Sequence, residues 1–361
     1  MRKYLFAVFS LLFILSLLSS CRPPELEGAY VDFNAGRFDN ALENAEKATR
    51  MYPKNPEAWY MLGRLYGKKD NYKGMMEAFE KSLAISKQFE NQIKNEKMLY
   101  FQNSFNSGVT NFNKFTKLED TESEQAVKLL NTALENFKNA KLINNDYQSS
   151  SLIARTYNLL KQKENALAEY QELTKNYPDS SMAWLAIGKV HFFDKDYKNA
   201  VTYLARAQEL DPTNLETISF LSQSYDKLED TENAIAAYEQ AIALNKTEVA
   251  FPFNLGLIYN RLANKEGIEE DLKNEYLNKV VENFDLVIQI DPQQKSGWEM
   301  KSIALIQLKR NDDAVSTIKS ALERFPNEGS FWFNLGVAYT NGGKAKVGKE
   351  AFKKAEELGY K

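Results

Sequence analysis

The residue types best suited to nucleophilic and metal chemistry are almost absent from this sequence. It has one cysteine, Cys21, and one histidine, His191. A disulfide needs two thiols, a Cys/His zinc site needs several ligands, and a Cys–His or Ser–His mechanism needs a histidine free for proton transfer. Only carboxylate, Lys or Tyr chemistry survives as an enzymatic option. We therefore predict no catalytic residue, no metal and no cofactor.

Cys21 follows a segment with the layout of a secretory signal peptide. Two basic residues precede an uncharged apolar stretch, Tyr4 to Leu18, which is shorter than the roughly 20 apolar residues of a transmembrane anchor. Residues 18–21, Leu-Ser-Ser-Cys, resemble the lipobox of bacterial lipoproteins. The resemblance implies that residues 1–20 are a signal peptide cleaved before Cys21, and that the thiol of Cys21 is acylated. A free buried cysteine is the alternative.

The lipid anchor predicts where the protein lies. Two or three acyl chains attach a protein stably to a membrane surface without inserting it. In the enterobacterial lipoproteins that this segment resembles, Asp after the acylated Cys retains the protein in the inner membrane, so Arg22 favours the outer membrane. We expect a lipid-anchored protein of the bacterial cell envelope, on either the periplasmic or the surface face.

The composition is that of a folded globular protein. Hydrophobic residues make up 43% of the chain and charged residues 26%, which excludes a wholly disordered chain and a polytopic membrane protein. Lys and Arg number 46 against 49 Asp and Glu, for a net charge of -3. Because there is no basic excess, we expect no nucleic-acid partner.

Rare residues recur with a period of 34 residues. Trp298 and Trp332 are 34 residues apart, as are Pro178 and Pro212. One period reads, in order, Trp184, Ile187, Gly188, His191, Ala200, Leu204, Ala207 and Pro212. This pattern resembles the tetratricopeptide repeat, whose 34-residue unit is a pair of antiparallel helices.

The resemblance implies an all-α fold, an α-solenoid in which helix pairs stack into a right-handed superhelix. About nine units fill residues 22–361 as a single solenoid, starting near residues 22, 56, 90, 147, 181, 215, 249, 295 and 329. Small residues such as Gly188 and Gly256 are expected to let two helices approach closely. The units near 90 and 249 carry polar insertions, which we interpret as hairpins with both arms lengthened.

The inner groove holds the candidate site. In this repeat family, positions 2, 5, 9, 12 and 13 of each first helix line the groove. In the units near 147, 181 and 249 these positions form an apolar lane edged by cations, namely Arg155, Met182, Leu185, Lys189, Phe192, Phe193, Phe253, Leu257 and Arg261. Exposed apolar patches of this kind mark partner sites. The alternative is that the curvature buries several of these side chains against neighbouring first helices.

Two other motifs have simpler explanations. His191 stands where other repeats have Tyr, which favours a packing role. Gly343, Gly348 and Lys349 have the spacing of a phosphate-binding loop, but Glu350 replaces its Ser/Thr and no strand is expected before it.

These observations favour a non-enzymatic scaffold or adaptor. We expect its groove to bind an apolar peptide segment or helix of an envelope partner. The first alternative is a lipoprotein that captures glycans or nutrients, although the chain has no room for a large irregular sugar-binding domain. The second is a carboxylate-based cell-wall enzyme, although no acid pair stands out.

Overall fold

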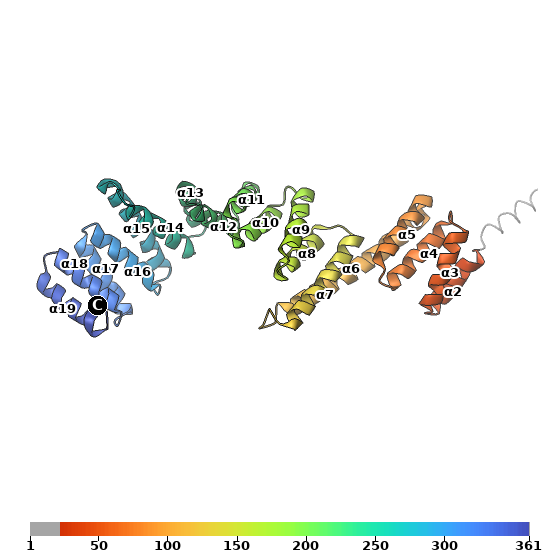
Figure 1. Cartoon of the computed structure of the whole chain (residues 1–361), viewed down its shortest axis with the longest axis horizontal. Coiled ribbons are helices and arrows are strands. Elements are labelled where there is room, and N and C mark those ends of the chain that lie inside the picture. Colours follow the sequence, from red (N-terminus) through yellow and green to blue (C-terminus); the bar gives the residue numbers. More distant parts are fainter. Residues whose placement is uncertain (1–21, 361) are drawn as a thin grey trace, which may run out of the picture. The chain divides into compact units, whose positions relative to one another are not determined.

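The computed structural model describes residues 22–360 and consists of helices and turns (Figure 1). In this part of the chain there are eighteen α-helices, arranged in order as nine pairs, and no strand. The all-α fold of paired helices predicted from the sequence is therefore confirmed. Cys21 and residues 1–20 lie outside the described residues.

The chain divides into two compact units, Met1–Leu173 and Thr174–Lys361. The first contains α2 (Pro24–Asn34), α3 (Phe38–Met51), α4 (Pro56–Lys68), α5 (Tyr72–Ile85), the short 3-10 helix η1 (Lys87–Phe89), α6 (Glu90–Phe115), α7 (Glu124–Ile143), α8 (Tyr147–Leu159) and most of α9 (Lys163–Asn176). The second contains α10 (Ser181–Phe193), α11 (Tyr197–Leu210), α12 (Leu215–Lys227), α13 (Thr231–Leu244), α14 (Ala250–Ala263), α15 (Glu270–Ile290), α16 (Lys295–Gln307), α17 (Asn311–Arg324), α18 (Gly329–Asn341) and α19 (Ala345–Glu357).

Local sequence explains where the first helix of a pair begins. The side chain of Asn55 accepts hydrogen bonds from the backbone N–H groups of α4, and Ser180 and Asn214 do the same for α10 and α12. Such caps satisfy N–H groups that have no partner within the helix. Each cap therefore marks the start of a first helix in the sequence.

The turn inside each regular pair has a left-handed residue at a constant place. The backbone φ angle is 57° at Asp70, 62° at Lys195 and 60° at Glu229, and the corresponding positions in the first and last pairs are glycines, Gly36 and Gly343. A left-handed residue after a helix closes its last turn and redirects the chain. The non-glycine residues adopt this conformation at some energetic cost, because their Cβ atoms crowd the backbone.

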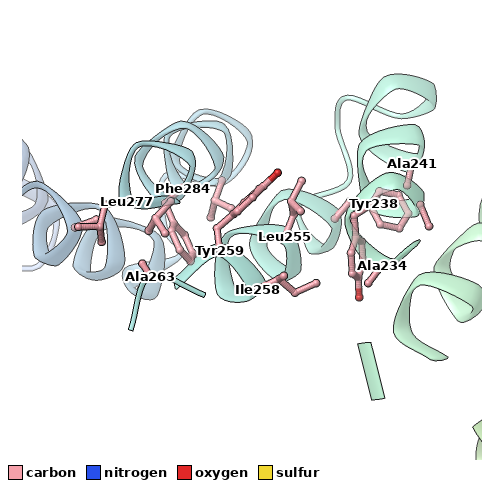
Figure 2. Close-up of a cluster of buried hydrophobic side chains, with 14 of the residues drawn as sticks. Ala234, Tyr238, Ala241, Leu255, Ile258, Tyr259, Ala263, Leu277 and Phe284 are labelled. Carbon is pink, nitrogen blue, oxygen red and sulfur yellow. The ribbon is translucent and has the colours of Figure 1, made fainter. Parts of the chain in front are cut away.

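Glycine in a first helix faces a large side chain in the second helix of the same pair. A Cβ atom on Gly256 of α14 would lie 2.8 Å from the Phe284 ring of α15, and one on Gly188 of α10 would lie 2.7 Å from Leu204 of α11. The predicted role of these glycines in close helix packing is confirmed. Figure 2 shows the resulting core of the second unit, where Phe284 and Leu277 of α15 gather with buried side chains of α14.

The four tryptophans make the same hydrogen bond. The indole N–H of each donates to the backbone carbonyl of the proline six residues earlier, at 2.8 to 3.0 Å, in the pairs Trp59–Pro53, Trp184–Pro178, Trp298–Pro292 and Trp332–Pro326. This bond links the loop after one pair to the first helix of the next. It gives a physical reason for the joint recurrence of Trp and Pro.

The two elongated pairs differ from one another. Near residue 90 both helices are long, since α6 has 26 residues and α7 has 20. Near residue 249 the first helix, α14, has 14 residues, close to the 13 of most other first helices, and only α15 is extended, to 21. The expectation that both arms lengthen in this second pair is wrong, because α14 ends at Ala263 and the insertion forms the turn and the first part of α15.

Candidate functional site

Three phenylalanine rings form a cluster on α10 and α12 in the second unit. The ring centroid of Phe220 lies 5.0 Å from that of Phe192 and 5.6 Å from that of Phe193, both in edge-to-face geometry. Phe192 and Phe193 also meet edge to face, at 5.6 Å. We call Phe192, Phe193 and Phe220 the aromatic cluster.

The cluster has a packed base and an exposed ring. Phe192 and Phe220 are partly buried and pack on the core of this pair, and Phe192 also contacts the ring of Tyr197 at 5.6 Å. Phe193, the last residue of α10, remains 67% exposed. A large apolar ring that is held in place by its neighbours and left open to solvent is suited to contact with another molecule.

Leu185 differs from the sequence prediction of an exposed groove residue. It is only 2% exposed and belongs to the core, with Leu204 of α11 and Leu221 of α12. The side chain faces the neighbouring helices, so Leu185 supports the aromatic cluster without contributing to the surface.

The other predicted apolar residues are divided between surface and core. Met182 and Leu257 are 52% and 38% exposed, which keeps both available on the surface. Phe253 is partly buried and meets the Phe284 ring edge to face at 5.7 Å. Phe253 therefore contributes to the packing of α14 on α15.

The two predicted cations of the second unit are paired. Lys189 forms an ion pair with Glu216 of α12, and its ammonium lies 5.3 Å from the centroid of Phe220. The guanidinium of Arg261 is 2.7 Å from a carboxylate oxygen of Asp226, also on α12. The edge of the lane thus consists of neutral pairs that join consecutive first helices, rather than the free basic rim that the sequence suggested.

Arg155 belongs to the first unit. It is exposed on α8, and its guanidinium carbon lies 5.1 Å from the ring centroid of Phe112 on α6. This geometry is a cation–π contact within that unit.

His191 has a structural environment. Its Nδ1 atom lies 3.0 Å from a carboxylate oxygen of Asp196, and its ring stacks on Tyr203 at 5.1 Å. Hydrogen bonds from Asn199, and the one shared with His191, lower the pKa of the Asp196 carboxyl. Because Asp196 also caps α11, His191 is part of the turn between α10 and α11.

Sequence reasoning missed one residue of this surface, Phe220, and the pairing of two others, Glu216 and Asp226. Phe220 stands at the sixth position of its first helix, outside the positions used to trace the groove. Glu216 and Asp226 are at groove positions of the unit near 215, but their pairing across neighbouring repeats becomes apparent only from the structure. Opposite charges at groove positions of successive repeats were the available signal.

Residues 22–360 contain neither a metal-binding cluster nor a membrane-spanning helix. Within these residues, no group of three or more His, Cys, Asp or Glu side chains is placed to hold a metal ion. None of the described helices combines the length and the apolar character that crossing a bilayer requires.

One tetratricopeptide repeat family model matches the chain at residues 26–88, 160–214 and 300–359, and a second model of the same repeat matches residues 215–248. Together these segments cover more than half of the 361 residues. The chain belongs to the tetratricopeptide repeat family. The helix pairs in the matched segments are repeats of that family, and the aromatic cluster lies on the first helices of two consecutive matched repeats.

Individual relatives are distant. The peroxisomal targeting signal receptor of Saccharomyces cerevisiae is 23% identical over 212 residues, which is 50% of this chain and 34% of the receptor. The receptor of Kluyveromyces lactis is 25% identical over 209 residues, covering 55% and 33% of the two chains. The chain thus spans about a third of the length of these relatives.

Solved structures with similar folds include the MamA protein and YrrB. A MamA structure is 24% identical, covers 49% of this chain and 95% of its own, and has a TM-score of 0.39. YrrB, described as a tetratricopeptide repeat protein with an unusual peptide-binding site, is 14% identical, covers 52% and 91%, and has a TM-score of 0.43.

Proposed function

We propose that this protein is a non-enzymatic scaffold that binds an apolar peptide segment or helix of another protein at the aromatic cluster. The observation that carries the proposal is the 67% exposure of Phe193 above the packed rings of Phe192 and Phe220. Interfaces are enriched in aromatic residues, and a few large anchors account for most of the binding free energy.

The charges around the cluster indicate the chemistry of the partner segment. The ion pairs Lys189–Glu216 and Arg261–Asp226 leave no unpaired charge of either sign among these four groups. A charged partner side chain would have to compete with a pair that already exists, whereas an uncharged apolar side chain would only displace water from the rings. We therefore expect the bound segment to contact the cluster through aliphatic or aromatic side chains.

The names of the relatives support a peptide ligand in general terms. The two yeast relatives are receptors for a peroxisomal targeting signal, and YrrB is described with a peptide-binding site. These names concern the ligands of the relatives, and the partner of the present protein is proposed only from its own residues.

We further propose that the protein works in the bacterial cell envelope, anchored through an acylated Cys21 and associated with the outer membrane. The support is the sequence Leu-Ser-Ser-Cys after an apolar stretch, with Arg22 as the next residue. Metabolic labelling with a fatty-acid analogue should mark the wild-type protein and not Cys21→Ser. Equal labelling of both would reject the anchor and leave the binding proposal standing.

Site-directed crosslinking tests the binding proposal. A photoreactive phenylalanine analogue in place of Phe193 should form a covalent adduct with an envelope protein, and the same analogue in place of Val347, 42% exposed on α19, should not. The double substitution Phe192→Ser, Phe193→Ser should abolish the pull-down of that partner while the helical circular dichroism remains. A folded double mutant that still binds would move the site elsewhere, and retention of a polysaccharide in place of a protein would favour glycan capture.

A further inference from the structure

A second candidate site lies in the first unit, at the base of the elongated pair α6 and α7. There the structure has a cavity of about 390 Å³ between α5, α6 and the end of α7. This volume is in the range of small-molecule sites, which run from roughly 300 to 1,000 Å³. The cavity involves neither α10 nor α12, so it is separate from the aromatic cluster.

The walls of the cavity are mostly hydrocarbon, with Asn144 as a polar residue among them. Leu83 of α5, Ile93 and Phe101 of α6, and Ile143 of α7 line it, and Met98 adds a flexible thioether that is 53% exposed at its edge. The backbone groups of the helices bond within the helices. Apart from Asn144, these walls offer an extended peptide few hydrogen-bond partners for its amide groups, whereas an alkyl chain needs none.

The opening of the cavity is positively charged. Lys94 and Lys97 line it, three positions apart on α6, and within the described residues neither ammonium forms an ion pair. Of the two carboxylates in this stretch of α6, Glu96 is held by Arg64 at 2.9 Å, and Glu90 lines the cavity four positions before Lys94 on the same helix, so the lining has two cations and one anion. Side chains three positions apart on a helix are neighbours, so both lysines can reach one anion.

A comparable cavity in the second unit lacks this feature. It measures about 460 Å³ and lies between α13, α14 and α15. There Lys279 is already bound to Glu282 at 3.0 Å, and two more carboxylates, Glu239 and Glu248, line the walls. Lys246 also lines this second cavity, which therefore holds, among the described residues, one unpaired lysine beside three acidic side chains, whereas the cavity beside α6 holds two unpaired lysines and one acidic side chain.

We propose that this cavity binds a medium-chain fatty carboxylate. The alkyl chain lies against Ile93, Phe101 and Ile143, and the carboxylate lies between the ammonium groups of Lys94 and Lys97. Apolar burial supplies most of the affinity, and the two charge-assisted hydrogen bonds select an anionic end group.

Calorimetric titration of the full-length protein tests this assignment with dodecanoate below its micelle concentration. Dodecanoate should bind about tenfold or more tightly than dodecan-1-ol, since hydrogen bonds to charged groups exceed neutral ones. Affinity should also rise from hexanoate to dodecanoate as more CH₂ groups are buried. Equal affinity for acid and alcohol, or no binding of dodecanoate, would overturn the proposal.

Charge reversal supplies the matched control. The pair Lys94→Glu, Lys97→Glu should weaken dodecanoate binding by about tenfold or more, while Lys114→Glu, Lys117→Glu, with the same spacing near the far end of α6, should not change it. Both variants alter surface lysines, and their helical circular dichroism should match the wild type. An unaltered affinity in the first variant, or an equal loss in both, would refute the site.

A third titration distinguishes a fatty acid from a peptide C-terminus, since both carry a carboxylate next to apolar groups. Acetyl-Ala-Leu-Leu-Phe with a free terminal carboxylate presents the same end group as dodecanoate but carries backbone amides. We expect it to bind at least about tenfold more weakly, because its amide groups would lose their hydration in the cavity. Tighter binding of the peptide than of dodecanoate would reject the fatty carboxylate.

Discussion

The first helices of the two units present their aromatic rings in opposite ways. In the first unit, the guanidinium of Arg64 lies 4.3 Å from the ring centroid of Phe33 and is fixed by Glu96 of the next first helix. Arg22 likewise lies 4.1 Å from the Tyr30 ring and is 2.8 Å from Glu57. In the second unit, ion pairs also join consecutive first helices, but Phe193 stays 67% exposed beside them.

The difference follows from where each cation lies relative to a ring. An Arg guanidinium is planar, stacks on aromatic faces and still reaches a carboxylate with its edge. Lys189 touches only the face of Phe220, and Arg261 pairs with Asp226, so Phe193 has no cation above it. The paired arginines of the first unit therefore cover its aromatic rings, whereas the ion pairs of the second unit leave Phe193 accessible to a partner.

The largest expected loss of stability comes from removing a repeat tryptophan, and it tests whether the same packing supports both units. Trp298 is 9% exposed and its indole N–H donates to Pro292, so Trp298→Ala should cost about 3–5 kcal/mol, the usual range for a buried large aromatic. Trp59→Ala in the first unit should act in the same direction, because its indole makes the same bond to Pro53. Denaturant midpoints measure both changes.

The control separates the ring from the hydrogen bond. Trp298→Phe keeps most of the apolar contact and removes only the N–H donor, which should cost about 1 kcal/mol. An unchanged midpoint in Trp298→Ala would mean that the phasing of this repeat is wrong.

Alkaline pH should weaken the cores of both units. Burial raises the pKa of Tyr100 in the first unit and of Tyr238 in the second, each to about 12 from an ordinary value of 10.0. Below pH 10 these phenols are protonated whether the protein is folded or not. Between pH 10 and 12 the unfolded chain releases its protons first, so the free energy of unfolding should fall as the pH rises.

Urea denaturation at pH 9, 10 and 11 measures this dependence, and Tyr238→Phe is its matched control. The variant removes the ionisable group but keeps the ring, so its stability should fall less steeply above pH 10 than that of the wild type. Equal slopes in the two proteins would show that Tyr238 ionises as readily in the folded state as in the unfolded one.

The sequence predicts the framework well, because it depends on local and periodic features. Gly256 opposite Phe284, and Trp298 near Pro292, repeat at fixed spacings since every helix pair solves the same packing problem. The length of α15 was less predictable. Its polar, helix-favouring insertion fits either arm of the hairpin, and the position of the turn decides which arm grows.

The candidate site was only partly predictable. Phe192 and Phe193 emerged from their groove positions, but the burial of Leu185 and the contribution of Phe220 depend on how α10 packs against α11 and α12. The pairing of Lys189 with Glu216 depends on side chains 27 residues apart meeting across two repeats. The repeat positions predict which residues face the groove, but they do not predict the contacts that these residues make with neighbouring helices.

A smaller loss of stability is expected when the arginine that covers an aromatic ring of the first unit is removed. Arg64→Ala should uncover Phe33 and leave Glu96 without its partner, at a cost of about 1 kcal/mol because the pair is only partly buried. The variant should also bind more of a hydrophobic dye such as anilinonaphthalene sulfonate than the wild type does. Arg64→Lys is the control, since an ammonium keeps the charge and loses the planar stack.

Dye binding and stability together decide this prediction. If Arg64→Ala binds no more dye than the wild type and loses no stability, the guanidinium does not cover the rings, and the contrast between the two surfaces fails.

The smallest expected change in stability comes from removing the exposed ring itself. Phe193→Ser should shift the free energy of unfolding by no more than about 0.5 kcal/mol, because a side chain that is 67% exposed loses little contact when it is truncated. Phe192→Ser should cost more, since that ring is partly buried and touches Tyr197 and Phe220. Comparing the two denaturant midpoints separates the exposed ring from its base. If Phe193→Ser destabilises the protein as much as Phe192→Ser, then Phe193 belongs to the core. The aromatic rings of the second unit would then be covered, as those of the first unit are.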